Sequence, residues 1–174
     1  MKYFVLIILI AMTVGLSNCK EGKLFTFYVE DQTTTTIENI LPVESPIDIP
    51  TPDITTNSTQ EFENHDTKIN LVKEIVLREL MLTIISPDDE DFSFLKDISI
   101  YISADGEEEI LLASLNDINS ETNTISLELT EEILDNYVKK ESYSLRTEAV
   151  TRETLLRDVD IQIDLKFRVT ADLI

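Results

Sequence analysis

The feature that most constrains the fold is a strict alternation of apolar and polar side chains over residues 158–173. All eight odd positions are apolar (Val, Ile, Ile, Leu, Phe, Val, Ala, Leu), and all eight even positions are polar. Successive side chains of a strand point to opposite faces, so a shift of one residue would turn the whole apolar set toward water. The segment predicts a strand about 50 Å long, which we expect to bend between two sheets.

The same two-residue period recurs in shorter segments along the chain. Asp105 and Gly106 separate two of these segments, and an Asp-Gly pair in that place predicts a hairpin. The sequence shows no β-α-β rhythm, so we expect the strands to pair antiparallel. The expected strands cover residues 24–29 with a continuation to 37, 98–104, 110–115, 125–129 and 143–149.

Two segments show a helical period. Residues 68–79 fit either a helix or a strand, and we favour one long strand over residues 68–85 with an irregularity near residues 78–79. Residues 130–140 predict a short helix, because Thr130 can cap its start and an apolar face follows.

Residues 40–59 contain four of the five prolines, which interrupt both helices and sheet ladders. We expect a Pro-rich loop or an irregular edge segment that packs on the domain through Ile47, Ile49 and Ile54. A disordered linker is the alternative.

These patterns predict a mainly β protein, an antiparallel β-sandwich with one short helix near residues 130–140. Residues 24–174 are expected to form a single domain, since the chain has room for one ordinary core. In strand pattern the domain resembles the immunoglobulin- and fibronectin-like sandwiches of bacterial surface lipoproteins, and the late-embryogenesis-abundant type of sandwich. The resemblance implies an immunoglobulin-like fold.

The N-terminus has the composition of an export signal. Lys2 gives a positive charge before an apolar run over residues 3–16. The run is shorter than the roughly 20 residues that a membrane-spanning helix needs, and its length suits the apolar core of a signal peptide.

The next residues, LSNC at positions 16–19, resemble the cleavage motif of bacterial lipoprotein precursors, from which Asn18 departs. The resemblance implies cleavage between Asn18 and Cys19, removal of residues 1–18, and acylation of Cys19 with palmitate and further chains. Several acyl chains hold a protein firmly to a membrane. Residues 19–23 would then be a lipidated tether.

An ordinary secretory signal and an uncleaved anchor are the alternatives to a lipoprotein. Cys19 is the sole cysteine, so no intrachain disulfide can form, and acylation would remove a free thiol from an exported domain. Lys20 follows it, whereas Asp at that place retains some lipoproteins at the inner membrane. The resemblance therefore implies the outer membrane or the cell surface.

The charge balance limits the partners and suggests one metal. With 34 acids, 14 bases and a net charge of −20, the surface repels phosphate backbones, so we expect no nucleic acid partner. Two acidic loops offer oxygen ligands to calcium, and the alternative is solvated charge at strand ends. The calcium candidates are Asp88, Asp89, Asp91 and Asp105. We expect no other cofactor.

The chain lacks the residues of common catalytic sites. Its only histidine, His65, is expected in a solvated loop, and no Gly-x-Ser-x-Gly motif is present. We therefore expect no enzyme. Tyr28 and Tyr101 fall on the polar sides of their strands, with Tyr143 on another strand, and exposed tyrosines suit a binding surface.

The sequence thus predicts a lipid-anchored protein of the bacterial cell envelope. Its β-sandwich would have a structural or protein-binding role, with the membrane and another envelope protein as partners. The alternative is a carrier of lipid or another small molecule, held in a cavity between the sheets.

Overall fold

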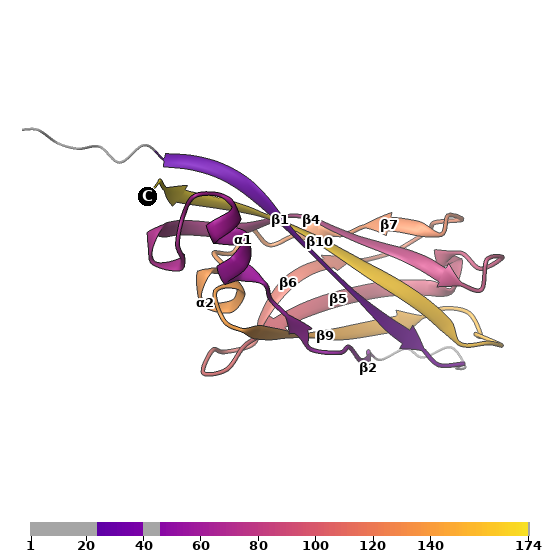
Figure 1. Cartoon of the computed structure of the whole chain (residues 1–174). Helices are drawn as coiled ribbons and strands as arrows, with labels where there is room; N and C mark the ends of the chain where they lie inside the picture. Colours follow the sequence, from indigo (N-terminus) through magenta and orange to yellow (C-terminus); the bar gives the residue numbers. More distant parts are fainter. Residues whose placement is uncertain (1–23, 40–45, 174) are drawn as a thin grey trace, which may run out of the picture.

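The computed structural model describes residues 24–39 and 46–173, so the predicted cleavage and lipidation residues, Asn18 and Cys19, lie outside it. The described chain is mainly β, with two antiparallel sheets packed face to face (Figure 1). In the first sheet the order is β1 (Leu24–Ile37), β10 (Val159–Asp172), β4 (Val72–Ser86), β7 (Thr124–Ser126). In the second it is β2 (Ile47–Pro50), β9 (Ser142–Thr151), β5 (Leu95–Ser103), β6 (Ile110–Leu115), β8 (Glu128–Leu129), and β3 (Ile54–Thr55) also pairs with β9.

β10 confirms the alternation in the sequence, because its side chains are alternately buried and half-buried along the whole strand. It is antiparallel to β1 on one side and to β4 on the other. The prediction that this strand bends between the two sheets is wrong. Both neighbours have 14 residues or more, so they pair with β10 over nearly its whole length and keep it in the first sheet.

The chain passes between the sheets at residues 124–129 instead. Residues 125–129 were predicted as one strand, but β7 pairs with β4 in the first sheet and β8 pairs with β6 in the second. Between them the backbone N–H of Leu127 donates to the carbonyl of Leu80 at 3.0 Å. One short alternating segment therefore contributes a few residues to each sheet.

β4 confirms the favoured strand from Val72 onward, and a helix over residues 68–79 is wrong. Only Ile69–Leu71 forms a short 3-10 turn, η1, before the strand. The predicted irregularity is also confirmed. Glu79 pairs with Lys166 and Leu77 with Phe167, so Arg78 is the extra residue of a β-bulge.

Two helices are present among the described residues, not one. Near residues 130–140, α2 (Asp135–Val138) is shorter than predicted, and Thr130 does not cap it. The Thr130 hydroxyl instead donates to the carbonyls of Leu111 and Leu112. The unpredicted helix, α1 (Ser58–Asn64), follows the proline-rich segment and is fixed by Phe62, which is fully buried.

The described part of residues 40–59 is an edge segment with its own pairing. β2 and β3 both pair with β9, and Ile49 and Ile54 are buried in the core while Ile47 is half-buried. A disordered linker is therefore wrong for residues 46–59. The isoleucines predicted to pack on the domain do so.

The last two strands are distributed between the sheets differently from those of an immunoglobulin constant domain. The last two strands of an immunoglobulin constant domain, F and G, share one sheet. Here β9 lies in the second sheet and β10 in the first, between β1 and β4. The buried side chains of both sheets form one continuous core.

Candidate functional site

The two acidic loops with the calcium candidates lie at opposite ends of the sandwich. We call the end with α1, α2 and the start of β1 the near end, and the end with residues 87–91 and 152–158 the far end (Figure 1). β5 runs from one end to the other between the two loops. Asp88, Asp89 and Asp91 are therefore separated from Asp105 by the length of a strand.

At the far end Asp89, Glu90 and Asp91 have protein partners. Asp89 and Glu90 bind Arg157, with nitrogen–oxygen distances of 3.1 and 3.6 Å. The hydrogen bond from Arg157 lowers the pKa of Asp89, and hydrogen bonds from Ser93 lower the pKa of Asp91. These acids stabilise the turn before β5.

At the near end the loop between β5 and β6 is bound to α2 and the residues that follow it. Lys140 donates to the carbonyl of Asp105 at 3.0 Å and pairs with Glu107 at 3.6 Å. The Tyr137 hydroxyl donates to the carbonyl of Glu108 at 2.8 Å. Gly106, with a φ of +76°, makes the predicted turn. Across residues 24–39 and 46–173, no three side chains gather as metal ligands.

A hydrogen-bonded pair, a half-buried aspartate and a buried tyrosine, links the two sheets. Asp31 lies on the inward-facing side of β1, and the hydroxyl of Tyr143 donates to its carboxylate at 2.9 Å. Tyr143 is only 1% exposed, and its ring packs edge-on against Phe167 with centroids 6.2 Å apart. Asp31 and Tyr143 are 112 residues apart in the sequence.

Burial changes the titration of both groups. Desolvation raises the pKa of Asp31 and the nearby Glu61 carboxylate raises it further, while the hydrogen bond from Tyr143 acts in the opposite direction. Burial, followed by the charge of Asp31, raises the pKa of Tyr143 well above its ordinary value of 10.0. A Tyr hydroxyl this deeply buried and already bonded is unsuited to act on a substrate.

The position of Asp31 has a structural explanation. An inward-pointing charge on an edge strand is one way to prevent a further strand from adding to the sheet. β1 is such an edge strand. The sequence already marks Asp31 as unusual, because it interrupts the apolar odd positions that begin at Phe25. It does not show that Tyr143 is the hydrogen-bond partner.

The outer face of the second sheet carries a cluster centred on Arg146. Its guanidinium donates to Glu109 at 2.7 and 2.9 Å, to Asp48 at 2.7 Å, and to Glu148. It also lies 4.2 Å from the ring centroid of Tyr101. These hydrogen bonds raise the pKa of Arg146 and connect β2 to its neighbours in the sheet.

The predicted tyrosines and histidine therefore differ in setting. Tyr28 is exposed on the outer face of β1, as predicted, beside the ammonium of Lys166. Tyr101 is half-buried beneath Arg146, and Tyr143 is inside the core. His65 is not in a solvated loop, since its half-buried ring stacks on Phe27 at 4.2 Å directly after α1.

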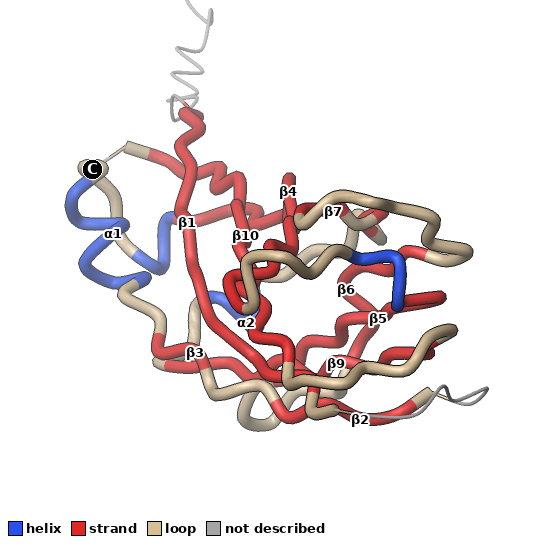
Figure 2. Tube along the Cα trace, turned by 90° about the vertical axis from the view of Figure 1, so that its right-hand side faces the viewer, coloured by secondary structure: helices blue, strands red, loops and turns tan. Residues whose placement is uncertain are grey.

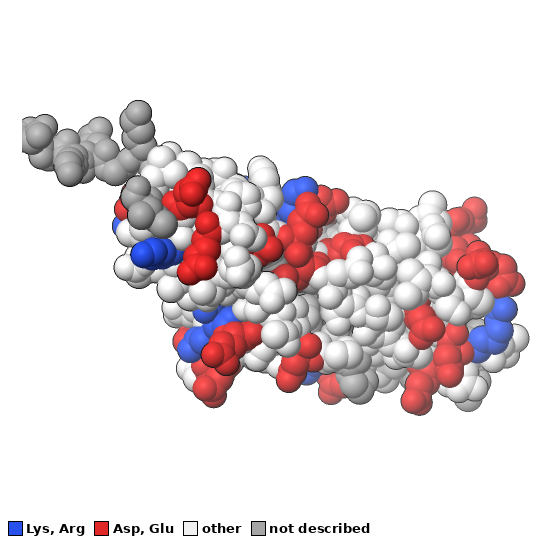
Figure 3. Space-filling view, viewed as in Figure 1, with Lys and Arg blue, Asp and Glu red and all other residues white. Residues whose placement is uncertain are grey.

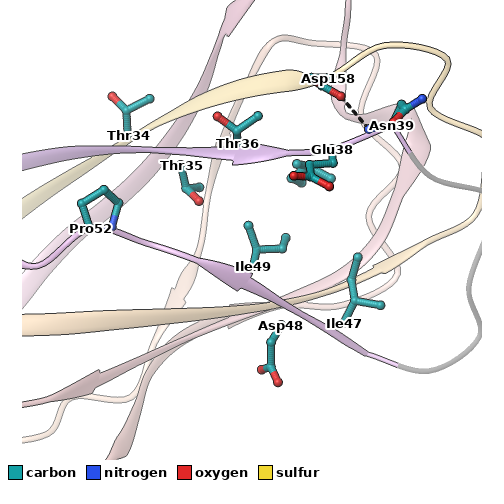
Figure 4. Close-up of a pocket in the computed structure, with 11 residues that line it drawn as sticks. Thr34, Thr35, Thr36, Glu38, Asn39, Ile47, Asp48, Ile49, Pro52 and Asp158 are labelled. Atoms are coloured by element: carbon teal, nitrogen blue, oxygen red, sulfur yellow. Dashed lines mark hydrogen bonds between the residues drawn. The ribbon is translucent and has the colours of Figure 1, made fainter.

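An open cleft of about 780 Å³ lies between β1 and β2 (Figure 4). Thr35 and Ile49 point into the space between the strands, whereas Thr34 and Thr36 point away from it. At one end the backbone N–H of Asn39 donates to Asp158 at 2.8 Å. Deeper between the sheets, an enclosed space walled by isoleucines and other side chains has no room for a water molecule.

The face drawn in Figure 3 shows no concentration of positive charge among the described residues. Acidic side chains are spread along the whole visible face, and most basic ones lie beside them (Figure 3). No helix of the described residues is long and apolar enough to cross a membrane. The chain matches no protein-family model and no curated protein. Its function must therefore be inferred from its own residues.

Proposed function

We propose that the protein is a lipid-anchored component of a bacterial cell envelope, exposed at the outer membrane or the cell surface. One observation carries the proposal: the only cysteine, Cys19, directly follows an apolar run and a lipoprotein-like motif at residues 16–19. The position of β1 supports it, since this strand begins five residues later, at Leu24. The anchor would hold the sandwich close to the membrane.

The role of the sandwich itself is proposed to be structural or protein-binding rather than catalytic. The half-buried carboxylate of Asp31 accepts a hydrogen bond from Tyr143, while Asp89 pairs with Arg157 and Asp91 accepts from Ser93. These groups stabilise the fold and are not free to activate a substrate. Two antiparallel sheets support a sandwich, and its immunoglobulin-like classification stays a prediction.

Labelling with palmitate tests the anchor. Cells that express the full chain should incorporate labelled palmitate into it, and Cys19→Ala should abolish the label and leave the uncleaved precursor. Ser17→Ala is the matched control, because it keeps a small residue in the motif and should keep the label. A wild-type protein without label would exclude the lipoprotein, and protease treatment of intact cells would then locate the domain.

The alternative function, a carrier with a ligand between the sheets, has less support. Side chains fill the enclosed space between the sheets, and the larger cleft at β1 and β2 is open and partly polar. Native mass spectrometry after mild extraction distinguishes the two functions. A ligand that co-purifies in constant ratio would favour the carrier, and an empty protein favours the structural role.

A further inference from the structure

Three large apolar side chains are exposed at the near end of the sandwich. Leu24 is 60% exposed, Leu173 is 48% exposed and Ile69 is 36% exposed. Leu24 pairs with Asp172, the residue before Leu173. The hydroxyl of Thr67, two residues before Ile69, donates to the carbonyl of Asp172 at 2.7 Å. The three side chains therefore belong to one end of the molecule, where Figures 1 and 2 place the start of β1, α1 and the end of β10.

The short tether between Cys19 and Leu24 would limit how far the near end can lie from the membrane. Five residues separate the Cα atom of Cys19 from that of Leu24, and an extended chain of five residues spans at most about 18 Å. If Cys19 carries acyl chains, Leu24 stays within that distance of the bilayer surface. The far end is much more distant, because β1 alone spans about 45 Å.

We propose that Leu24, Ile69 and Leu173 form a membrane-contacting surface, so that the near end lies against the lipid bilayer and the far end points away from it. This inference rests on the proposed lipid anchor. The contact is apolar, because a chain with a net charge of −20 gains nothing from anionic headgroups. Zwitterionic lipid is therefore the expected partner.

Such a contact would explain why these apolar side chains are left in water by the fold. Seven large apolar side chains are exposed among the described residues, and three of them, Leu24, Ile69 and Leu173, belong to this end. Exposed apolar side chains gathered at one place mark an interaction site more often than scattered ones do. Leu156, at 84% exposure, provides the internal comparison, since it is equally apolar but lies in the loop before Arg157, at the far end.

The chain contains no tryptophan, so single substitutions provide clean fluorescent reporters. The full-length protein is expressed in bacteria, extracted from membranes, and reconstituted into phosphatidylcholine vesicles with or without brominated acyl chains. Leu24→Trp and Leu173→Trp report on the near end, and Leu156→Trp reports on the far end. All three positions are exposed, so the fold should tolerate the larger ring, and circular dichroism checks this.

Near-end reporters should show a blue shift in vesicles and lose emission with brominated lipid, whereas Leu156→Trp should show neither. Near-end reporters that are unquenched in membrane-bound protein would overturn the contact surface and leave the anchor intact. Equal quenching at all three positions would overturn the upright orientation. A protein absent from the membrane fraction would exclude the proposed anchor, and this inference with it.

Discussion

β10 and β2 both run antiparallel to their neighbours and both bury isoleucine side chains in the same core, but different interactions hold them. β10 has a partner on each side over nearly its whole length. β2 pairs only with β9, over four residues, and Arg146 adds a hydrogen bond to Asp48 on its outer face. The local alternation of side chains therefore determines β10, at the centre of the first sheet. β2, at the edge of the second sheet, is held by residues that are distant in the sequence.

The largest expected effect is at the centre. Phe167 is fully buried on β10, so Phe167→Ala removes a large side chain that packs on both sheets. The free energy of unfolding should fall by about 3–5 kcal/mol, measured by urea denaturation. Thr170→Ala, on the outward face of the same strand, is the control and should cost less than about 1 kcal/mol. Equal losses at both positions would contradict the assigned register of β10.

At the edge the corresponding change should cost less. Ile49→Ala removes a buried side chain from β2, and the loss should be about 2 kcal/mol, because an edge strand with one neighbour can relax around the space. In the variant the amides of β2 should exchange faster than those of β10, whose exchange reports global unfolding and should accelerate only as far as the measured loss of stability requires. If the amides of β2 and β10 exchange with the same free energy in the variant, β2 unfolds only with the whole domain and the two regions are equivalent.

The same contrast explains how much of the fold was predictable. The alternation of β10, the bulge at Arg78 and the hairpin at Gly106 are local properties of the sequence. α1 depends on Phe62 reaching the core, and the division of residues 124–129 depends on which sheet each half meets. Both features depend on tertiary contacts, which cannot be read from the local spacing of apolar residues.

The candidate site was predicted less well for the same reason. An acidic loop has the same appearance in sequence whether it binds a cation or an arginine, and Arg157 is far from Asp89 along the chain. The pairing of Asp31 with Tyr143 likewise joins residues 112 positions apart. The sequence indicates which side chains carry charge, but the partners of those charges follow from the fold.

Tyr143→Phe tests the polar pair that connects β9 to β1. The change leaves the half-buried carboxylate of Asp31 without the hydroxyl donor, so the free energy of unfolding at neutral pH should fall by about 1–2 kcal/mol. Tyr28→Phe is the matched control, since Tyr28 is 52% exposed on the outer face, and it should leave stability unchanged. Chemical denaturation of both variants gives the comparison, and equal stability of the two would remove the pair as a link between the sheets.

The pH dependence of stability gives a second test of this pair. Between the ordinary value of 3.8 and the raised pKa of Asp31, the folded protein keeps a proton that the unfolded chain has released, so Asp31 lowers stability as pH rises. Asp31→Asn removes this titration. The stability of Asp31→Asn relative to wild type should therefore increase from about pH 3.8 upward and become constant above the raised pKa. A difference that does not change with pH would mean that Asp31 titrates normally.

The smallest effect is expected at the salt-bridge cluster that joins β2 to the second sheet. Arg146→Lys keeps the charge but loses the two hydrogen bonds to Glu109 and the stacking on Tyr101. Because Arg146 and its partners are partly exposed, water and salt screen them, and the loss should be below about 1 kcal/mol. Adding salt should reduce the difference between variant and wild type further. A larger, salt-independent loss would mean that this cluster, rather than the burial of Ile49, is the main interaction that holds β2 in place.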